Sequence, residues 1–191
     1  MTEQKKELEL KAYFFVPYNI SPIQQGIQTK HAFDEFLLTY GRNNSKHIVW
    51  DYMEKHKTVI ILNGGTTNNR YEFGTGIPVG TLNQIVEQLQ QNAVEYGWFQ
   101  EPDLNDALTA ICFIADERVW NYEDYPNLVD YICDRLVKDR KNDISDKVRI
   151  SLMPEIQIMK DYFDYHYEWG KMMGGEKNIF LRELIRGKKL A

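Results

Sequence analysis

A stripe of polar side chains lies within residues 21–40, and it contains the group best suited to acid–base chemistry. One flank of a helix receives a side chain every three or four positions, and this is the spacing of Gln24, Gln28, His31 and Glu35. An imidazole ordinarily exchanges its proton near neutral pH, so His31 is a candidate general base. The alternative is a surface or core-flank histidine that is hydrogen-bonded to Glu35.

The stripe needs a helix to position it, and the sequence indicates where this helix begins. Ser21 suits the N-cap, Pro22 suits the first helical position, and Gln24 completes a capping box. Gly41 stands where a C-cap glycine is common, so we expect the helix to end there. Its core-facing side is predicted to be the broad apolar face of Ile23, Ile27, Phe33, Leu37 and Tyr40.

Composition favours a folded protein outside the membrane. The 191 residues suit one main domain with an extension, and 43% hydrophobic and 13% aromatic residues are too many for a disordered chain. No apolar run approaches the roughly 18 residues that a membrane helix needs. The N-terminal ten residues are charged where a signal peptide would be apolar, so we expect a cytoplasmic protein with no membrane partner.

Cysteine and histidine spacing predicts neither a disulfide nor a metal site. Cys112 lies in an apolar run and Cys133 in a helical pattern, so both are interpreted as small buried side chains of a reducing compartment. The four histidines are scattered, and no paired spacing typical of metal ligands occurs. We expect no metal and no cofactor.

Charge is distributed unevenly along the chain. Residues 1–121 contain 10 Lys and Arg against 15 Asp and Glu, whereas residues 122–191 contain 13 of each. Proteins that grip nucleic acid usually cluster cations, because neutralising phosphates supplies most of the affinity. No such cluster is visible in residues 1–121.

Strand and helix patterns alternate through the first part of the chain. Apolar runs predict four strands, at residues 11–17, 57–63, 98–101 and 108–114. Besides the first helix, we expect a short helix with Trp50 packed inward, and a longer one that Thr81 and Gln84 open with a capping box. The predicted fold is therefore a three-layer α/β domain over residues 1–121, with a mixed four-stranded sheet flanked by helices.

The segment Gly64–Gly80 is rich in glycine and long for a connection. Its five glycines lack the Gly-Lys-Ser/Thr ending of a phosphate-binding loop. We interpret the segment as an insertion or a long hairpin, and its alternatives are an ordinary surface loop and a lid or partner-binding loop.

Residues 122–191 are predicted to form a mainly helical C-terminal extension. Lys138–Asp146 is expected to be a solvated connection, 148–152 a strand or helical turn, and an aromatic helix begins at Pro154. An aromatic stripe at helical spacing usually packs against a domain or another subunit. Residues 154–173 are thus a candidate surface for a protein partner or a homo-oligomer.

Four stretches, taken in order, resemble the type-two peptidyl-tRNA hydrolases, and particularly small relatives carried by bacteriophages. Residues 28–32, Gln-Thr-Lys-His-Ala, are similar to the Gln-Cys-Ser-His-Ala motif of that family. A tryptophan before the second strand, the helix from Thr81, and an aspartate turn at Pro102-Asp103 before the strand that contains Thr109 complete the likeness. The resemblance covers about residues 11–117.

The resemblance implies a site where the first helix meets the aspartate turn, and hydrolysis of the ester between peptide and tRNA. It carries over His31, Asp103, Gln28 and Thr109. On this hypothesis His31 activates a water. Asp103 orients the His31 side chain or binds the amine of the ester, and Gln28 or Thr109 donates to the oxyanion. The family's lysine is replaced by Gln24, and its arginine-containing run by residues 103–107, Asp-Leu-Asn-Asp-Ala.

Those two replacements favour a second hypothesis. A catalytically inactive binding or structural protein with the hydrolase-like fold would use the Gly64–Gly80 loop and the aromatic helix to hold a partner. If a phage encodes it, the resemblance implies a virion component or a factor acting in the host cytoplasm.

Overall fold

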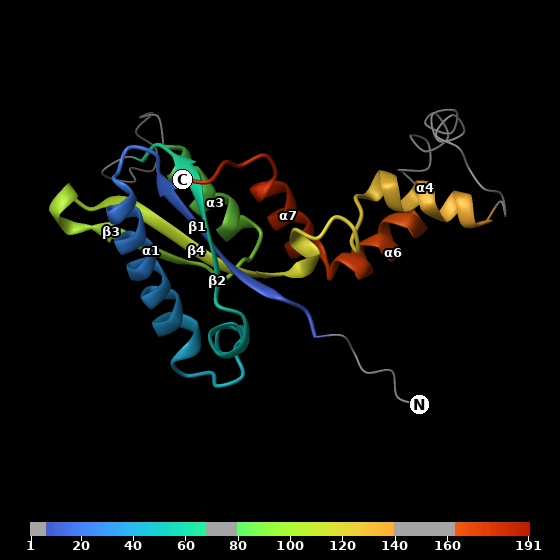
Figure 1. Cartoon of the computed structure of the whole chain (residues 1–191), viewed down its shortest axis with the longest axis horizontal. Coiled ribbons are helices and arrows are strands. Elements are labelled where there is room, and N and C mark those ends of the chain that lie inside the picture. The colour runs from blue at the N-terminus through green and yellow to red at the C-terminus, as the bar shows by residue number, and fades with distance from the viewer. Residues whose placement is uncertain (1–6, 68–79, 140–162) are drawn as a thin grey trace. The chain divides into compact units, whose positions relative to one another are not determined.

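The computed structural model describes residues 7–67, 80–139 and 163–191 (Figure 1). The chain divides into two compact units: residues 1–117 with 184–191, and residues 118–183. The sequence places a single boundary at residue 121, whereas residues 184–191 belong to the first unit.

A mixed four-stranded sheet forms the centre of the first unit, as predicted. Its strand order is β2-β1-β4-β3. β1 is parallel to β2 and antiparallel to β4, and β3 is antiparallel to β4. The bounds are β1 Leu10–Pro17, β2 Thr58–Gly65, β3 Gly97–Glu101 and β4 Ala107–Asp116.

Helices cover both faces of this sheet and make three layers. α1 (Pro22–Phe36) contacts β1, β3 and β4, and α3 (Thr81–Gln91) contacts β1, β2 and β4. Ala110 of β4 packs in the cluster that includes Ala32 of α1, whereas Leu108 lines a cavity with Val86 of α3. The short helix α2 (Ile48–Asp51) continues into a π-helical turn at Tyr52–His56.

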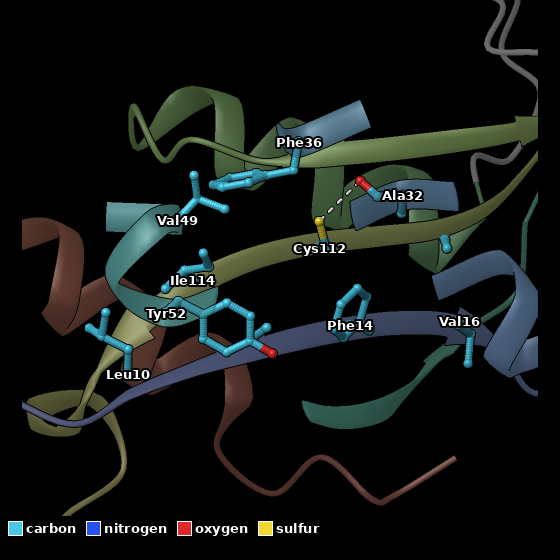
Figure 2. Packing of buried hydrophobic residues seen from close by; sticks show 11 residues of the cluster. Leu10, Phe14, Val16, Ala32, Phe36, Val49, Tyr52, Cys112 and Ile114 are labelled. Carbon is cyan, nitrogen blue, oxygen red and sulfur yellow. Dashed lines mark hydrogen bonds between the residues drawn. The ribbon is translucent and has the colours of Figure 1, made fainter. Parts of the chain in front are cut away.

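A hydrophobic core lies between α1 and the two central strands (Figure 2). Cys112 lies beneath α1, and its Sγ donates to the carbonyl oxygen of Ala32 at 3.2 Å. Burial raises the pKa of the Cys112 thiol far above its usual range, as the buried-thiol interpretation expects. The buried members are Leu10, Ala12, Phe14, Val16, Ala32, Phe36, Val49, Tyr52, Ala110, Cys112 and Ile114.

The start of α1 confirms the capping box, but its buried face differs from the prediction. Ser21 and Gln24 bond reciprocally as expected. Ile23 and Ile27, however, are 77% and 49% exposed. The buried residues of α1 are Gln25, Gln28, Thr29, Ala32 and Phe36. Three of these five are polar. The predicted apolar face is therefore wrong at Ile23 and Ile27, whereas Phe33, Leu37 and Tyr40 pack against the core cluster as partly buried side chains.

Close approach of β3 explains which side of α1 is buried. A Cβ on Gly97 would lie 2.3 Å from the carbonyl oxygen of Ala32 and 2.7 Å from the Cβ of Phe36. The small residues Ala32 and Gly97 therefore let the helix and the strand touch, and this contact decides which side of α1 faces the sheet.

Gly41 is not a C-cap glycine. α1 passes into a π-helical turn at Leu37–Gly41, and the cap is Arg42 in a right-handed conformation. A Cβ on Gly41 would lie 2.8 Å from a methyl of Leu37 and 2.9 Å from one of Val49. The glycine permits close packing against α2 rather than a left-handed turn.

Thr81 does not cap α3 either. The N-cap is Gly80, without a side-chain hydrogen bond. The Thr81 hydroxyl instead donates to the carbonyl of Gly64 and accepts from the N–H of Thr66, both at 2.8 Å. It therefore ties together the two ends of the glycine-rich segment, whose residues 68–79 lie outside the described part of the chain. The buried residues of α3 are Leu82, Asn83, Ile85 and Leu89.

The second unit contains α4 (Leu128–Asp139), α6 (Phe163–Met173) and most of α7 (Glu176–Ile185). Arg135 of α4 bonds Glu168 of α6 at 2.5 Å, and Tyr131 donates to the same carboxylate at 3.0 Å. α6 and α7 are separated by Gly174 and Gly175, whose φ angles are 82° and 101°.

The predicted aromatic helix is described only in its second half. The indole N–H of Trp169 donates to the carbonyl of Pro126 at 2.9 Å, and the side chain is 8% exposed. His166 and Tyr167 are exposed. The expected features at 140–146, 148–152 and 154–162 lie outside the described residues.

Candidate functional site

A buried glutamine joins α1 to β3 and β4. The amide nitrogen of Gln28 donates to a carboxylate oxygen of Glu101 at 2.6 Å, and its amide oxygen accepts from the hydroxyl of Thr109 at 2.6 Å. Gln28 is 7% exposed and Thr109 is 1% exposed. The three side chains thus form one hydrogen-bonded chain that orients each member, with the carboxylate at one end.

A β-bulge brings Thr109 into this chain. Phe99 pairs with Ala110, and the next residue of β3, Gln100, pairs with Leu108, so Thr109 is the extra residue of β4. An extra residue changes the alternation of side chains, which is why Thr109 and Ala110 both face α1. The Thr109 hydroxyl also lies 3.3 Å from the carbonyl of Phe99, but its single hydrogen favours the shorter bond to Gln28.

A cavity of about 190 Å³ opens at the Glu101 end of this chain. Asp103 reaches it from the 3₁₀ turn Pro102–Leu104 that follows β3. The chain then reverses through Asn105 and Asp106, both with left-handed φ angles, 57° and 59°. The cavity is lined by Ile20, Gln24, Gln28, Glu101, Asp103, Leu104 and Thr109.

His31 lies one helical turn beyond Gln28 and does not line this cavity. It is exposed, and its ring stacks on that of Phe99, with the centroids 4.5 Å apart. Within the described residues, no hydrogen bond joins His31 to Glu35. The structure therefore brings three of the four predicted site residues together, Gln28, Asp103 and Thr109, and places His31 on the neighbouring turn.

Glu101 is the site residue that sequence reasoning missed. It lies on the same face of β3 as Phe99 and Gly97, two and four positions earlier, and this face is the one that meets α1. The alternation along 97–101 is the signal that could have found it, once that face was known to be buried.

A histidine–carboxylate pair does exist in the first unit, but elsewhere. Nε2 of His47 lies 3.0 Å from a carboxylate oxygen of Glu95, and Nδ1 accepts from the N–H of Val49. Because Nδ1 accepts, the proton of the neutral ring is on Nε2 and is donated to Glu95. Both ring nitrogens are used to cap α2 and tie it to the segment before β3, which indicates a structural role.

The cavity is suited to hydrogen-bond donors rather than to phosphate. Among the described residues, its polar lining consists of two carboxylates, two amides and one hydroxyl, with no lysine or arginine. Carboxylates accept from N–H and ammonium groups and repel anions. In the parts of the chain that the structure describes, no group of three or more His, Cys, Asp or Glu side chains could hold a metal ion.

Two comparisons with known proteins found no relative of this chain. No protein-family model matches the chain, and a search of curated proteins finds no significant match. Among the described helices, none has the length and apolar character needed to cross a membrane.

Proposed function

We propose that the cavity beside Gln28 is the acyl-binding site of an ester hydrolase of the peptidyl-tRNA hydrolase type. The observation that carries this proposal is the Thr109–Gln28–Glu101 chain, which ends at a cavity shared with Asp103. In this assignment the N–H groups of the bound peptide donate to Glu101 and Asp103, and the tRNA phosphates lie outside the cavity, because its carboxylates would repel them.

His31 is assigned the role of general base in the proposed hydrolysis. His31 accepts a proton from a water, whose oxygen attacks the carbonyl carbon of the ester. The bond from that carbon to the ribose oxygen then breaks, and the ribose oxygen takes up the proton. His31 is the base because it is exposed, lies one turn from Gln28, and bears the side chain that ordinarily exchanges protons near neutral pH.

The observed hydrogen bonds narrow the choice of oxyanion donor. The hydroxyl hydrogen of Thr109 is given to Gln28, and one amide hydrogen of Gln28 is given to Glu101. The second amide hydrogen of Gln28 is therefore the donor that the proposal assigns to the oxyanion. Thr109 acts as a positioning residue, because it holds the amide of Gln28 in one orientation.

Release of N-acetylphenylalanine from N-acetylphenylalanyl-tRNA tests the proposal. We expect His31→Ala to lower kcat by about 10²-fold or more, the range for loss of a general base. His166→Ala removes an exposed histidine of the second unit and serves as the matched control, with unchanged activity. Absence of hydrolysis by the wild-type protein, or equal activity in His31→Ala, would contradict the assignment.

A second candidate function is a binding protein with the same fold and no turnover. The observation that favours it is that the described residues of the cavity lining include no Lys or Arg, together with the position of His31 outside that lining. This candidate predicts that N-acetylphenylalanine amide perturbs the amide signals of Gln28 and Asp103 while the ester of N-acetylphenylalanyl-tRNA stays intact.

A further inference from the structure

The outer edge of β2 already carries a short added strand. β2 is the terminal strand of the sheet, and its Leu62 forms an antiparallel bridge with Leu190. The N–H of Asn63 donates to the carbonyl of Lys189 at 2.9 Å, and the N–H of Ala191 donates to the carbonyl of Ile61 at 3.1 Å. Residues 189–191, here called the tail, therefore show that this edge accepts a further strand.

Of the residues that the structure describes, those of the tail pair with only part of this edge. Residues 61 and 63 direct main-chain groups outward, and main-chain groups alternate in direction along a strand, so Val59 also directs its N–H and C=O outward. The tail pairs no nearer than Ile61, and the Val59 side chain is 49% exposed. The tail itself is exposed, including Leu190 at 74%, and follows Gly187 with a φ of 69°.

An apolar groove of about 420 Å³ adjoins this uncovered part of the edge. Its lining residues come from α1, β1, β2 and the turn at residues 52–56, and Val59 of β2 lines it from the edge of the sheet. Tyr52, one of the lining residues, donates its hydroxyl to the carbonyl of Thr58 at 3.2 Å. The groove is lined by Phe14, Thr29, Lys30, Phe33, Tyr52, Met53, Lys57 and Val59.

The charged groups that line the groove are both ammonium groups. Lys30 forms an ion pair with Asp34, its neighbour one turn along α1, at 2.5 Å. Lys57 directly precedes β2 in a left-handed conformation, with a φ of 60°, and forms no ion pair with any of the described residues. Lys57 therefore offers a positive charge at the point where the free edge begins, although residues 1–121 carry an excess of acidic groups.

We propose that the Val59 edge and the adjoining groove together bind an extended peptide segment of a partner protein. The peptide adds to β2 through the outward N–H and C=O of Val59, which supplies main-chain hydrogen bonds. One large apolar side chain enters the groove, and an acidic side chain beside it meets Lys57. This binding site is separate from the cavity at Gln28 and does not depend on hydrolysis.

The first test uses a synthetic probe peptide, Ac-TVFVEG-amide, with the full-length protein. Binding is followed by fluorescence anisotropy of a labelled copy and mapped by amide chemical shifts. We expect the signals of Val59, Lys57 and Phe33 to move, and replacement of the central Phe by Ser to weaken binding at least tenfold. Shifts confined to other residues, or no binding at millimolar probe, would overturn the proposal.

The second test separates strand addition from simple occupation of the groove. Two probes are N-methylated at alternate peptide bonds, one at the odd-numbered and one at the even-numbered bonds. Both keep their side chains, but only one of them loses the N–H groups that face β2, so we expect that probe to bind about tenfold more weakly. On the protein, Val59→Pro removes the outward N–H, a change that edge strands tolerate, and Val59→Thr keeps the N–H as the matched control. Equal affinity of both methylated probes and the unmodified one would show that no strand is added.

Discussion

The two flanks of α1 differ in how they meet the sheet. Toward β3, Gln28 is closed in by hydrogen bonds of 2.6 Å to Glu101 and Thr109. Toward β2, Phe33 faces an open apolar groove. One helix thus has a polar flank whose side chains are held by hydrogen bonds, here called the hydrogen-bonded flank, and an apolar flank that borders a groove, here called the open flank. The comparison shows that burial on this helix follows from what each strand brings to it rather than from its own hydrophobic pattern.

Side-chain size on the neighbouring strands accounts for the difference. On the β3 side, Gly97 leaves no side chain between strand and helix, so main chains touch and polar groups must find partners within the contact. On the β2 side, the rings of Phe14 and Phe33 are 6.4 Å apart and those of Phe33 and Tyr52 are 5.8 Å apart, in tilted contacts. Large rings meeting at angles leave the groove between helix and strand.

Gly97→Ala should have the largest effect on stability, because it forces β3 and α1 apart at the hydrogen-bonded flank. The added Cβ would lie 2.3 Å from a main-chain oxygen that cannot move away freely, so we expect a loss of about 3 kcal/mol in the free energy of unfolding, the upper end for overpacking. Urea unfolding followed by tryptophan fluorescence measures this loss. Gly26→Ala is the control, since a Cβ there meets nothing within 4 Å and alanine favours the helix. Equal stability of the two variants would show that α1 and β3 are not in close contact.

Thr109→Val, on the hydrogen-bonded flank, should lower the free energy of unfolding by about 1–3 kcal/mol, because it leaves the amide oxygen of Gln28 buried without its donor. Gln28→Leu in the same background should recover part of this loss, since the unpaired amide oxygen is then absent. A double-mutant cycle on urea midpoints measures the coupling, which we expect to be about 1 kcal/mol. Additive effects would mean that the two side chains do not share a hydrogen bond.

Lys30→Ala tests the open flank and should cost under about 0.5 kcal/mol, because both the lysine and its partner Asp34 are exposed. The cost should fall further in 1 M NaCl, which screens exposed charges. Thermal unfolding at low and high salt measures it. A salt-independent loss as large as that of Thr109→Val would remove the distinction between the two flanks.

An exposed pair in the second unit should give the smallest effect and a defined pH dependence. The guanidinium of Arg135 holds the pKa of Glu168 below its usual range, with help from Tyr131. A carboxyl with a lowered folded pKa stabilises the fold above its unfolded pKa, and this contribution is lost as pH falls through the folded value. The α4–α6 contact should therefore loosen only in acid, and Glu168→Gln should abolish that pH dependence in hydrogen exchange of α6. Loosening at alkaline pH would reverse the expected sign.

The sheet was predictable from sequence because its information is local. Apolar runs such as residues 11–17 and 108–114 fall within the observed β1 and β4, and Ser21 with Gln24 specified the start of α1. The buried face of α1 was not predictable in this way. Its rotation depends on Gly97, which lies some sixty residues after the helix ends and which the helical pattern cannot reveal.

The candidate site was predictable only in part, for a similar reason. Gln28, Asp103 and Thr109 were named through the family resemblance, and they line one cavity. Glu101 was missed because its role depends on the bulge at Thr109 and on the helix opposite. The alternative interpretation of His31 paired it with Glu35, but its ring stacks on Phe99 of the strand beside it.

The most direct test of the proposed hydrolase is the rate of ester cleavage in Glu101→Gln. This variant keeps an oxygen that can accept from Gln28 and removes only the negative charge at the cavity. We expect cleavage of N-acetylphenylalanyl-tRNA to slow by about 10–100-fold, the equivalent of one hydrogen bond to a charged group, while exposed Glu54→Gln leaves the rate unchanged. A wild-type protein that cleaves the ester, with a Glu101→Gln rate equal to its own, would contradict the assignment of the reaction to this cavity.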